Sequence, residues 1–145
     1  MYKPKYFTIE ELVPPQLLDL VEEDVAWKMF DEDILRAIDW VKSTYSPDSP
    51  VTINNWKWGG NFTQSGLRTK DWEHYNPKST HPYGEAVDMK FKNITAEEIR
   101  QDLKGRGSSV PYITECEEGV SWLHISTSKR YNHLRPEGGV IFYPA

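Results

Sequence analysis

The sequence predicts an α+β fold, in which a small antiparallel sheet has helices packed on one side. Two observations support this prediction. Helical periodicity dominates the N-terminal part of the chain, whereas strand-like segments are mixed with one helix and then follow one another in the C-terminal half. This order of elements is typical of α+β proteins. At 145 residues the chain is also long enough to bury the core of a single domain, residues 1–145, without disulfide staples.

The N-terminal helices are expected from capping signals and apolar periodicity. Thr8 and Glu11 form a capping box, which predicts a short helix. Apolar residues form a stripe along a further helical segment at 16–24. The longest helix is expected to begin at the acidic residues from Asp31 onward, because negative charge is favourable at the N-terminus of a helix, and to end near residue 45.

The rest of the chain is expected to supply the sheet. The segment 55–83 is rich in Trp, Gly and Asn and lacks sustained periodicity. Long loops in compact domains are usually functional, so we expect a folded binding loop whose end presents His81. Thr95 and Glu98 form a second capping box and predict another helix. Strands are expected at 51–54, 86–91, 110–115, 121–127 and 140–143.

Composition limits the partners and the compartment. Lys and Arg total 17 against 22 Asp and Glu, a formal net charge of −5, which argues against nucleic acid as a partner. Cys116 is the only cysteine, so no intrachain disulfide can form. No segment has the length of a membrane span, and the N-terminal residues lack the apolar run of a signal peptide. We therefore expect a protein that is cytoplasmic at synthesis.

Two histidines and one aspartate are candidate metal ligands. His81 lies in a loop punctuated by Pro and Gly, Asp88 follows just inside a predicted strand, and His124 lies in a later one. Two nitrogens and one carboxylate oxygen leave the fourth position of a zinc tetrahedron open, as in catalytic zinc sites. The same ligands also accept other divalent ions.

The residues around these ligands resemble a known family. The segment 79–88 matches the S-x-H-x-x-G-x-A-x-D signature of the zinc D-alanyl-D-alanine peptidases, which share their fold with hedgehog signalling domains. The segment 122–124 resembles the later W-x-H element, and 65–68 resembles the S-G-[YLF]-R element that precedes the signature. The matching positions of the signature are Ser79, His81, Gly84, Ala86 and Asp88.

The resemblance implies a zinc-dependent peptidase that cuts a peptide bond in bacterial peptidoglycan, as a D-Ala-type carboxypeptidase or as an endopeptidase. A short form without a secretion signal is similar to bacteriophage lysins or virion-borne wall-degrading domains. Release to the cell wall and virion partners are therefore expected. A peptidase that acts on another peptide substrate is the weaker reading of the same ligands.

The resemblance also implies substrate-binding and catalytic residues. Arg68 is expected to clamp a carbonyl or carboxylate, because its planar fork binds oxyanions bidentately. Ser79 is expected to hydrogen-bond the same end of the substrate. Many members of the family carry an acid shortly before the last histidine ligand, but Ser121 stands there and cannot act as a base.

The missing acid leaves the general base open. Glu118 precedes His124 at the spacing of the glutamate in the hedgehog branch, so it is the first candidate for the base that takes a proton from water. Glu115 is the second candidate. If neither carboxylate reaches the ion, the chain is a zinc-binding structural or virion module with little or no activity.

Overall fold

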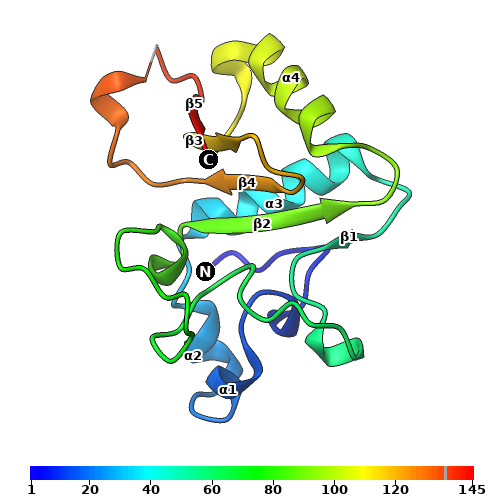
Figure 1. The fold of residues 1–145 in the computed structure, drawn as a ribbon, viewed down its shortest axis with the longest axis vertical. Coiled ribbons are helices and arrows are strands. Elements are labelled where there is room, and N and C mark those ends of the chain that lie inside the picture. Colours follow the sequence, from blue (N-terminus) through cyan, green and yellow to red (C-terminus); the bar gives the residue numbers. More distant parts are fainter. Residues whose placement is uncertain (136) are drawn as a thin grey trace.

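A five-stranded sheet forms the centre of the fold in the computed structural model, which describes residues 1–135 and 137–145 (Figure 1). The strand order is β1-β2-β4-β3-β5. Helices and sheet together confirm the predicted α+β class. The strands are β1 (Val51–Thr52), β2 (Ala86–Phe91), β3 (Glu115–Glu118), β4 (Leu123–Ser126) and β5 (Ile141–Pro144).

The sheet is mixed, so the prediction of a purely antiparallel sheet is wrong at one edge. β1, β2, β4 and β3 pair antiparallel, whereas β5 pairs parallel to β3, with Glu115 opposite Ile141. β3 lies between β4 and β5 and runs antiparallel to β4. Since β5 runs in the direction opposite to β4, it is parallel to β3.

Three predicted strands are shorter than expected. The strand expected at 110–115 begins only at Glu115, because Tyr112 has a φ of 65° and this left-handed conformation interrupts extended backbone. The strand expected at 121–127 covers Leu123–Ser126. The strand expected at 51–54 covers only Val51–Thr52. The strand expected at 140–143 is shifted by one residue, to Ile141–Pro144, and β2 spans the predicted 86–91.

The helices follow the capping signals. The capping box of Thr8 opens a short 3₁₀ helix, Ile9–Glu11. The segment expected as one helix at 16–24 is divided, because the chain becomes extended at Glu22 before it coils again. The capping box at Thr95 is formed, with Glu98 N donating to Thr95 Oγ1 at 3.1 Å. The α-helices are α1 (Pro15–Leu18), α2 (Glu23–Trp27), α3 (Glu32–Tyr45) and α4 (Ala96–Arg106).

One face of the sheet forms the core and the opposite face is left for a cleft. Side chains alternate along β2, so Val87 and Met89 point into the hydrophobic core while Asp88 points away from it. The same core includes Ile38 of α3 and Ile99 of α4, and α3 lies behind β2 in Figure 1. Among the described residues, no helix is long and apolar enough to cross a membrane.

A buried carboxylate fastens the N-terminal segment to the core helix. Asp39 of α3 accepts hydrogen bonds from the backbone N–H of Lys5 at 2.7 Å and of Tyr6 at 3.2 Å. It also accepts a hydrogen bond from the hydroxyl of Tyr2. Since Asp39 is only 7% exposed, water does not readily replace these contacts.

Replacing Asp39 by Ala is expected to lower the free energy of unfolding by about 2 kcal/mol or more, because partly buried donors lose their acceptor. Urea denaturation followed by circular dichroism measures the change. Asp48→Ala is the matched control, since Asp48 is exposed. Equal stabilities of the two variants would show that the N-terminal segment does not depend on this carboxylate.

Candidate metal centre

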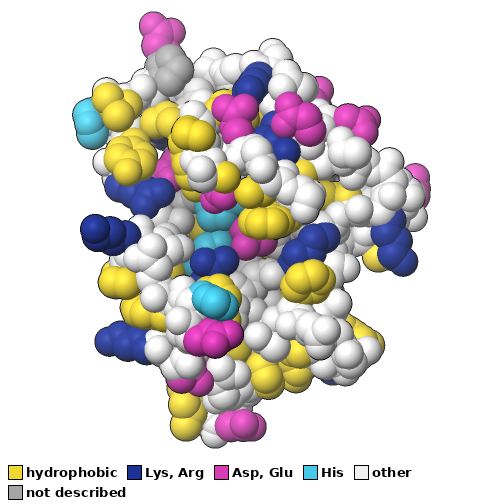
Figure 2. Space-filling view, in the orientation of Figure 1, with side chains coloured by type: hydrophobic (Ala, Val, Ile, Leu, Met, Phe, Trp, Pro, Cys, Tyr) yellow, Lys and Arg dark blue, Asp and Glu magenta, His cyan; other side chains and the backbone are white. Residues whose placement is uncertain are grey.

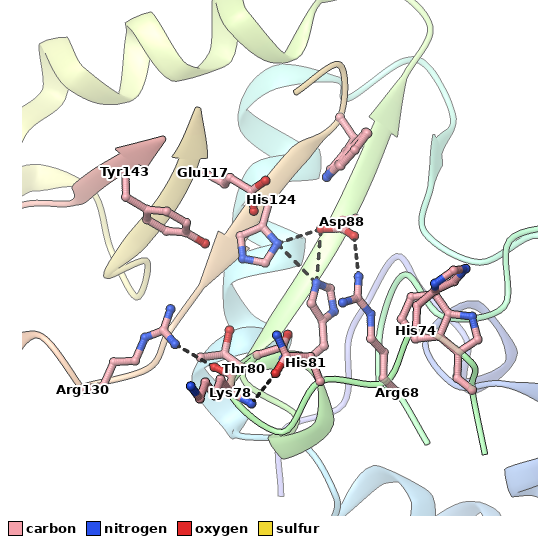
Figure 3. Close-up of a pocket in the computed structure, with 14 residues that line it drawn as sticks. Arg68, His74, Lys78, Thr80, His81, Asp88, Glu117, His124, Arg130 and Tyr143 are labelled. Atoms are coloured by element: carbon pink, nitrogen blue, oxygen red, sulfur yellow. Dashed lines mark hydrogen bonds and ion pairs between the residues drawn. The ribbon is translucent and has the colours of Figure 1, made fainter. Parts of the chain in front are cut away.

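The three predicted metal ligands meet at one point. His81 Nε2 lies 3.2 Å from His124 Nδ1 and 3.3 Å from Asp88 Oδ1, and His124 Nδ1 lies 2.8 Å from the same oxygen (Figure 3). Zinc bonds of about 2.0–2.1 Å in a tetrahedron place neighbouring ligand atoms about 3.3–3.4 Å apart. The triangle is therefore close to the size that a single ion needs, and the three residues could hold a metal ion.

Strand pairing and a tight turn bring the ligands together. Asp88 and His124 are direct partners across the β2–β4 ladder, so their side chains leave the same face of the sheet. His81 begins a 3₁₀ turn, His81–Tyr83, that ends at Gly84 with a φ of 69°. A Cβ on Gly84 would lie 2.1 Å from the carbonyl oxygen of Met29. The glycine of the motif is thus required by both backbone angle and space.

A backbone carbonyl orients the first histidine. His81 is 1% exposed, and its Nδ1 lies 2.9 Å from the carbonyl oxygen of Gly66. With Nδ1–H donating to this oxygen, the lone pair of Nε2 is directed toward the other two ligands. There is no space for a side chain at Gly66, because a Cβ there would lie 2.2 Å from the carbonyl oxygen of Leu12. Only glycine at position 66 therefore lets the backbone pass this close to Leu12 and place its carbonyl beside His81.

If the site holds a metal ion such as zinc, replacing Gly66 by Ala is expected to weaken its binding about tenfold or more, since the added methyl displaces the carbonyl that holds His81. Competition against a chelator of known affinity measures the change. Gly105→Ala is the control, because a Cβ at Gly105 meets nothing within 4 Å. An unchanged affinity in the Gly66 variant would show that this carbonyl does not orient the ligand.

The charge states of the ligands suit a cation. Burial raises the pKa of Asp88, but the two histidines outweigh it and hold the pKa well below its usual range. Burial is the main cause that lowers the pKa of His81, against the opposing effect of Asp88. The site thus presents an ionised carboxylate and a neutral imidazole, the forms that bind metal ions.

Arg68 contacts a ligand directly. Its Nη2 donates to Asp88 Oδ2 at 3.1 Å and its Nε to the carbonyl oxygen of Gln64 at 2.9 Å. The guanidinium also lies 4.8 Å from the ring centre of Trp72. Burial lowers the pKa of Arg68, opposed by Asp88 and Glu117. Arg68 therefore occupies the second oxygen of Asp88 and leaves the first for an ion.

A cavity of about 440 Å³ opens over the ligands. Figure 2 shows histidine side chains in a recess at the middle of this face, with basic, acidic and apolar side chains around it. Ser79 lies at the cavity wall as expected, and its Oγ accepts a hydrogen bond from His81 N at 3.2 Å. The lining also includes Arg68, Trp72, His74, Asn76, Lys78, Thr80, Glu117, Trp122, Arg130 and Tyr143.

The structure does not bring Glu118 to the ligands. Its carboxylate accepts a hydrogen bond from Lys104 Nζ of α4 at 2.8 Å, and Glu117 lines the cavity instead (Figure 3). The register gives the reason. Cys116 pairs with Ile125, and both side chains are fully buried in the core. The next residue, Glu117, therefore points to the opposite face, where the ligands lie.

The other candidate positions are also placed. Glu115 is fully buried, and Arg130 binds its carboxylate at 2.8–3.2 Å, so it is not available as a base. Ser121 lines a separate cavity beside the start of α4. Sequence reasoning missed Glu117, although strict alternation counted from Cys116 would have found it. It also missed Lys78, Arg130 and Tyr143, for which the sequence carries no local signal.

No protein-family model, no curated protein and no solved structure matches this chain. The resemblance to the zinc peptidases therefore rests on the matching motif residues, and the function has to be argued from the geometry of the site.

Proposed function

We propose that this chain is a zinc-dependent peptidase that hydrolyses a peptide bond in bacterial peptidoglycan, as a lysin-like carboxypeptidase or endopeptidase. The observation that carries the proposal is the His81–Asp88–His124 triangle, which lies at an open cavity and supplies three ligands. Three protein ligands and a free position are the pattern of catalytic zinc sites. The choice of peptidoglycan as substrate rests on the resemblance of the motif residues.

The residues around the triangle fit peptide hydrolysis. Zinc held there would polarise a peptide carbonyl and lower the pKa of water to about 7. In the proposal, Glu117 takes the proton that water loses as its oxygen bonds to the carbonyl carbon. Glu117 then gives this proton to the leaving amine as the C–N bond breaks. This assigns to Glu117 the role that the sequence alone assigned to Glu118.

Arg68 and Ser79 keep their proposed roles at the substrate. Arg68 uses Nε and Nη2 in its contacts with Gln64 and Asp88, which leaves the N–H groups of Nη1 for a substrate carbonyl or carboxylate. Because the guanidinium is fixed by these contacts, it can stabilise developing negative charge without reorganising. The hydroxyl of Ser79 lies at the same cavity and can donate to the substrate.

Incubation with purified peptidoglycan tests the proposal. Zinc-loaded protein should release new amino groups from at least one wall type, a chelator should stop the release, and added zinc should restore it. Mass spectrometry of the released muropeptides identifies the bond. Stoichiometric zinc binding without release from any wall type would refute the peptidase. That outcome would favour the zinc-binding structural or virion module.

A further inference from the structure

One wall of the cavity is built from hydrogen-bond donors that the proposed chemistry does not use. Lys78, Arg130 and Tyr143 line this wall. Figure 3 shows Arg130 and Tyr143 on the side of the ligands away from Arg68, with Tyr143 coming from β5. These residues therefore lie beside the candidate metal ligands and are not ligands themselves.

Arg130 is held in one orientation with donors to spare. Its Nε and Nη2 donate to the buried carboxylate of Glu115, and its Nη1 donates to the carbonyl oxygen of Lys78 at 3.1 Å. An arginine has five N–H donors, of which these contacts take three. Two N–H groups remain, and the side chain that carries them is 34% exposed, so a ligand can reach them. Such a fixed fork is suited to bind a carboxylate.

Lys78 and Tyr143 add donors to the same wall. Lys78 is exposed, and in the part of the chain that the structure describes its ammonium has no hydrogen-bond or ion-pair partner. Burial, together with Glu117 and Glu115, raises the pKa of Tyr143, so its hydroxyl stays protonated at neutral pH. Glu115 neutralises Arg130, and the positive charge of this wall therefore comes from Lys78.

The opposite end of the cleft differs in the charge of its lining side chains. A second cavity of about 170 Å³ shares Arg68, Trp72 and Asp88 with the first, so the cleft continues past the ligands. The rest of its lining carries no charged side chain. It consists of Asn61, Phe62, Thr63, Gln64 and Ser65. Apart from the paired Arg68 and Asp88, a bound chain would therefore meet uncharged lining side chains at one end, and Lys78 and Arg130 at the other.

We propose that Lys78 and Arg130 form a carboxylate subsite, so that the substrate carries a carboxylate on that side of the scissile bond. This inference rests on the proposed peptidase function. The carboxylate is either an acidic side chain or a free C-terminus. Both would accept from the two remaining N–H groups of Arg130 and pair with the ammonium of Lys78.

Binding of matched peptides tests the subsite. The probes are acetyl-alanyl-glutamate amide, acetyl-alanyl-glutamine amide, and acetyl-alanyl-glutamine with a free C-terminus, titrated into isotope-labelled protein and followed by NMR. At least one acidic peptide should bind about tenfold more tightly than the neutral one, because charge-assisted hydrogen bonds are strong. Whichever acidic peptide binds better identifies the source of the carboxylate.

Variants and removal of the metal distinguish carboxylate binding by Lys78 and Arg130 from carboxylate binding by the metal ion. Lys78→Gln should reduce the preference to about threefold or less, whereas Lys70→Gln, at an exposed lysine outside the cavity, should preserve it. Arg130→Lys keeps a charge beside Glu115 but lacks the fork, and it too should reduce the preference. The preference should persist in chelator-treated protein, so it is measurable even if the chain proves not to be a peptidase.

Two results would overturn the subsite. One is equal binding of the acidic and neutral peptides to the native protein. The other is a preference that survives both Lys78→Gln and Arg130→Lys but disappears with the metal, which would place the carboxylate on the ion itself.

Discussion

In the proposed peptidase, replacing Glu117 by Gln is expected to reduce the rate of peptidoglycan hydrolysis by about 10²–10⁴-fold, the usual contribution of a general base. Glutamine has nearly the same shape but cannot take a proton from water. The zinc content should stay unchanged, because Glu117 is not one of the three ligands. Release of amino groups under saturating substrate, with metal analysis of the same sample, measures both quantities.

The neighbouring carboxylate provides the control. Glu118→Gln changes the same chemical group one position along β3, but it affects a contact with Lys104 outside the cavity. This variant should keep its activity within about twofold, since partly exposed ion pairs contribute little. If Glu118→Gln were inactive and Glu117→Gln active, the roles of the two residues would have to be exchanged.

Replacing Asp88 by Asn is expected to have the largest effect on the metal. Loss of an outer partner of a ligand already costs about 10–100-fold in affinity, and loss of the anionic ligand itself should exceed this. Arg68 also loses its ion pair, although its guanidinium is substantially buried. Dialysed protein should contain no zinc, and its unfolding temperature should no longer rise when zinc is added.

The measurements are metal analysis after dialysis and thermal unfolding with and without zinc. Asp48→Asn, at an exposed aspartate, is the control and should behave like the native protein. Stoichiometric zinc in dialysed Asp88→Asn would mean that the ion binds elsewhere.

The three candidate metal ligands could be predicted because their signals are local. His81 and Asp88 belong to one short segment, and the alternation of β4 directs His124 away from the core. The capping boxes at Thr8 and Thr95 were likewise readable, since each depends on residues within a single turn. These features need no knowledge of distant contacts.

The side of the sheet that Glu117 faces and the pairing at the sheet edge depend on segments that are distant along the chain. A shift of one residue in β3 decides whether Glu117 or Glu118 faces the ligands, and the burial of Cys116 opposite Ile125 fixes it. The parallel pairing of β5 follows from the position of β3 between two later strands. The contact of Arg68 with Asp88 likewise joins segments that have no shared sequence pattern.

Because Asp88 and His124 are paired directly, binding of a metal ion by both would depend on the correct register of β2 and β4. If β4 slipped by one position along β2, His124 would turn into the core, and Leu123 and Ile125 would both leave it. Such a misaligned chain could not coordinate an ion with both strands. A bound metal ion would therefore favour the native register of β2 and β4, because it would stabilise only the chains in which Asp88 and His124 are paired.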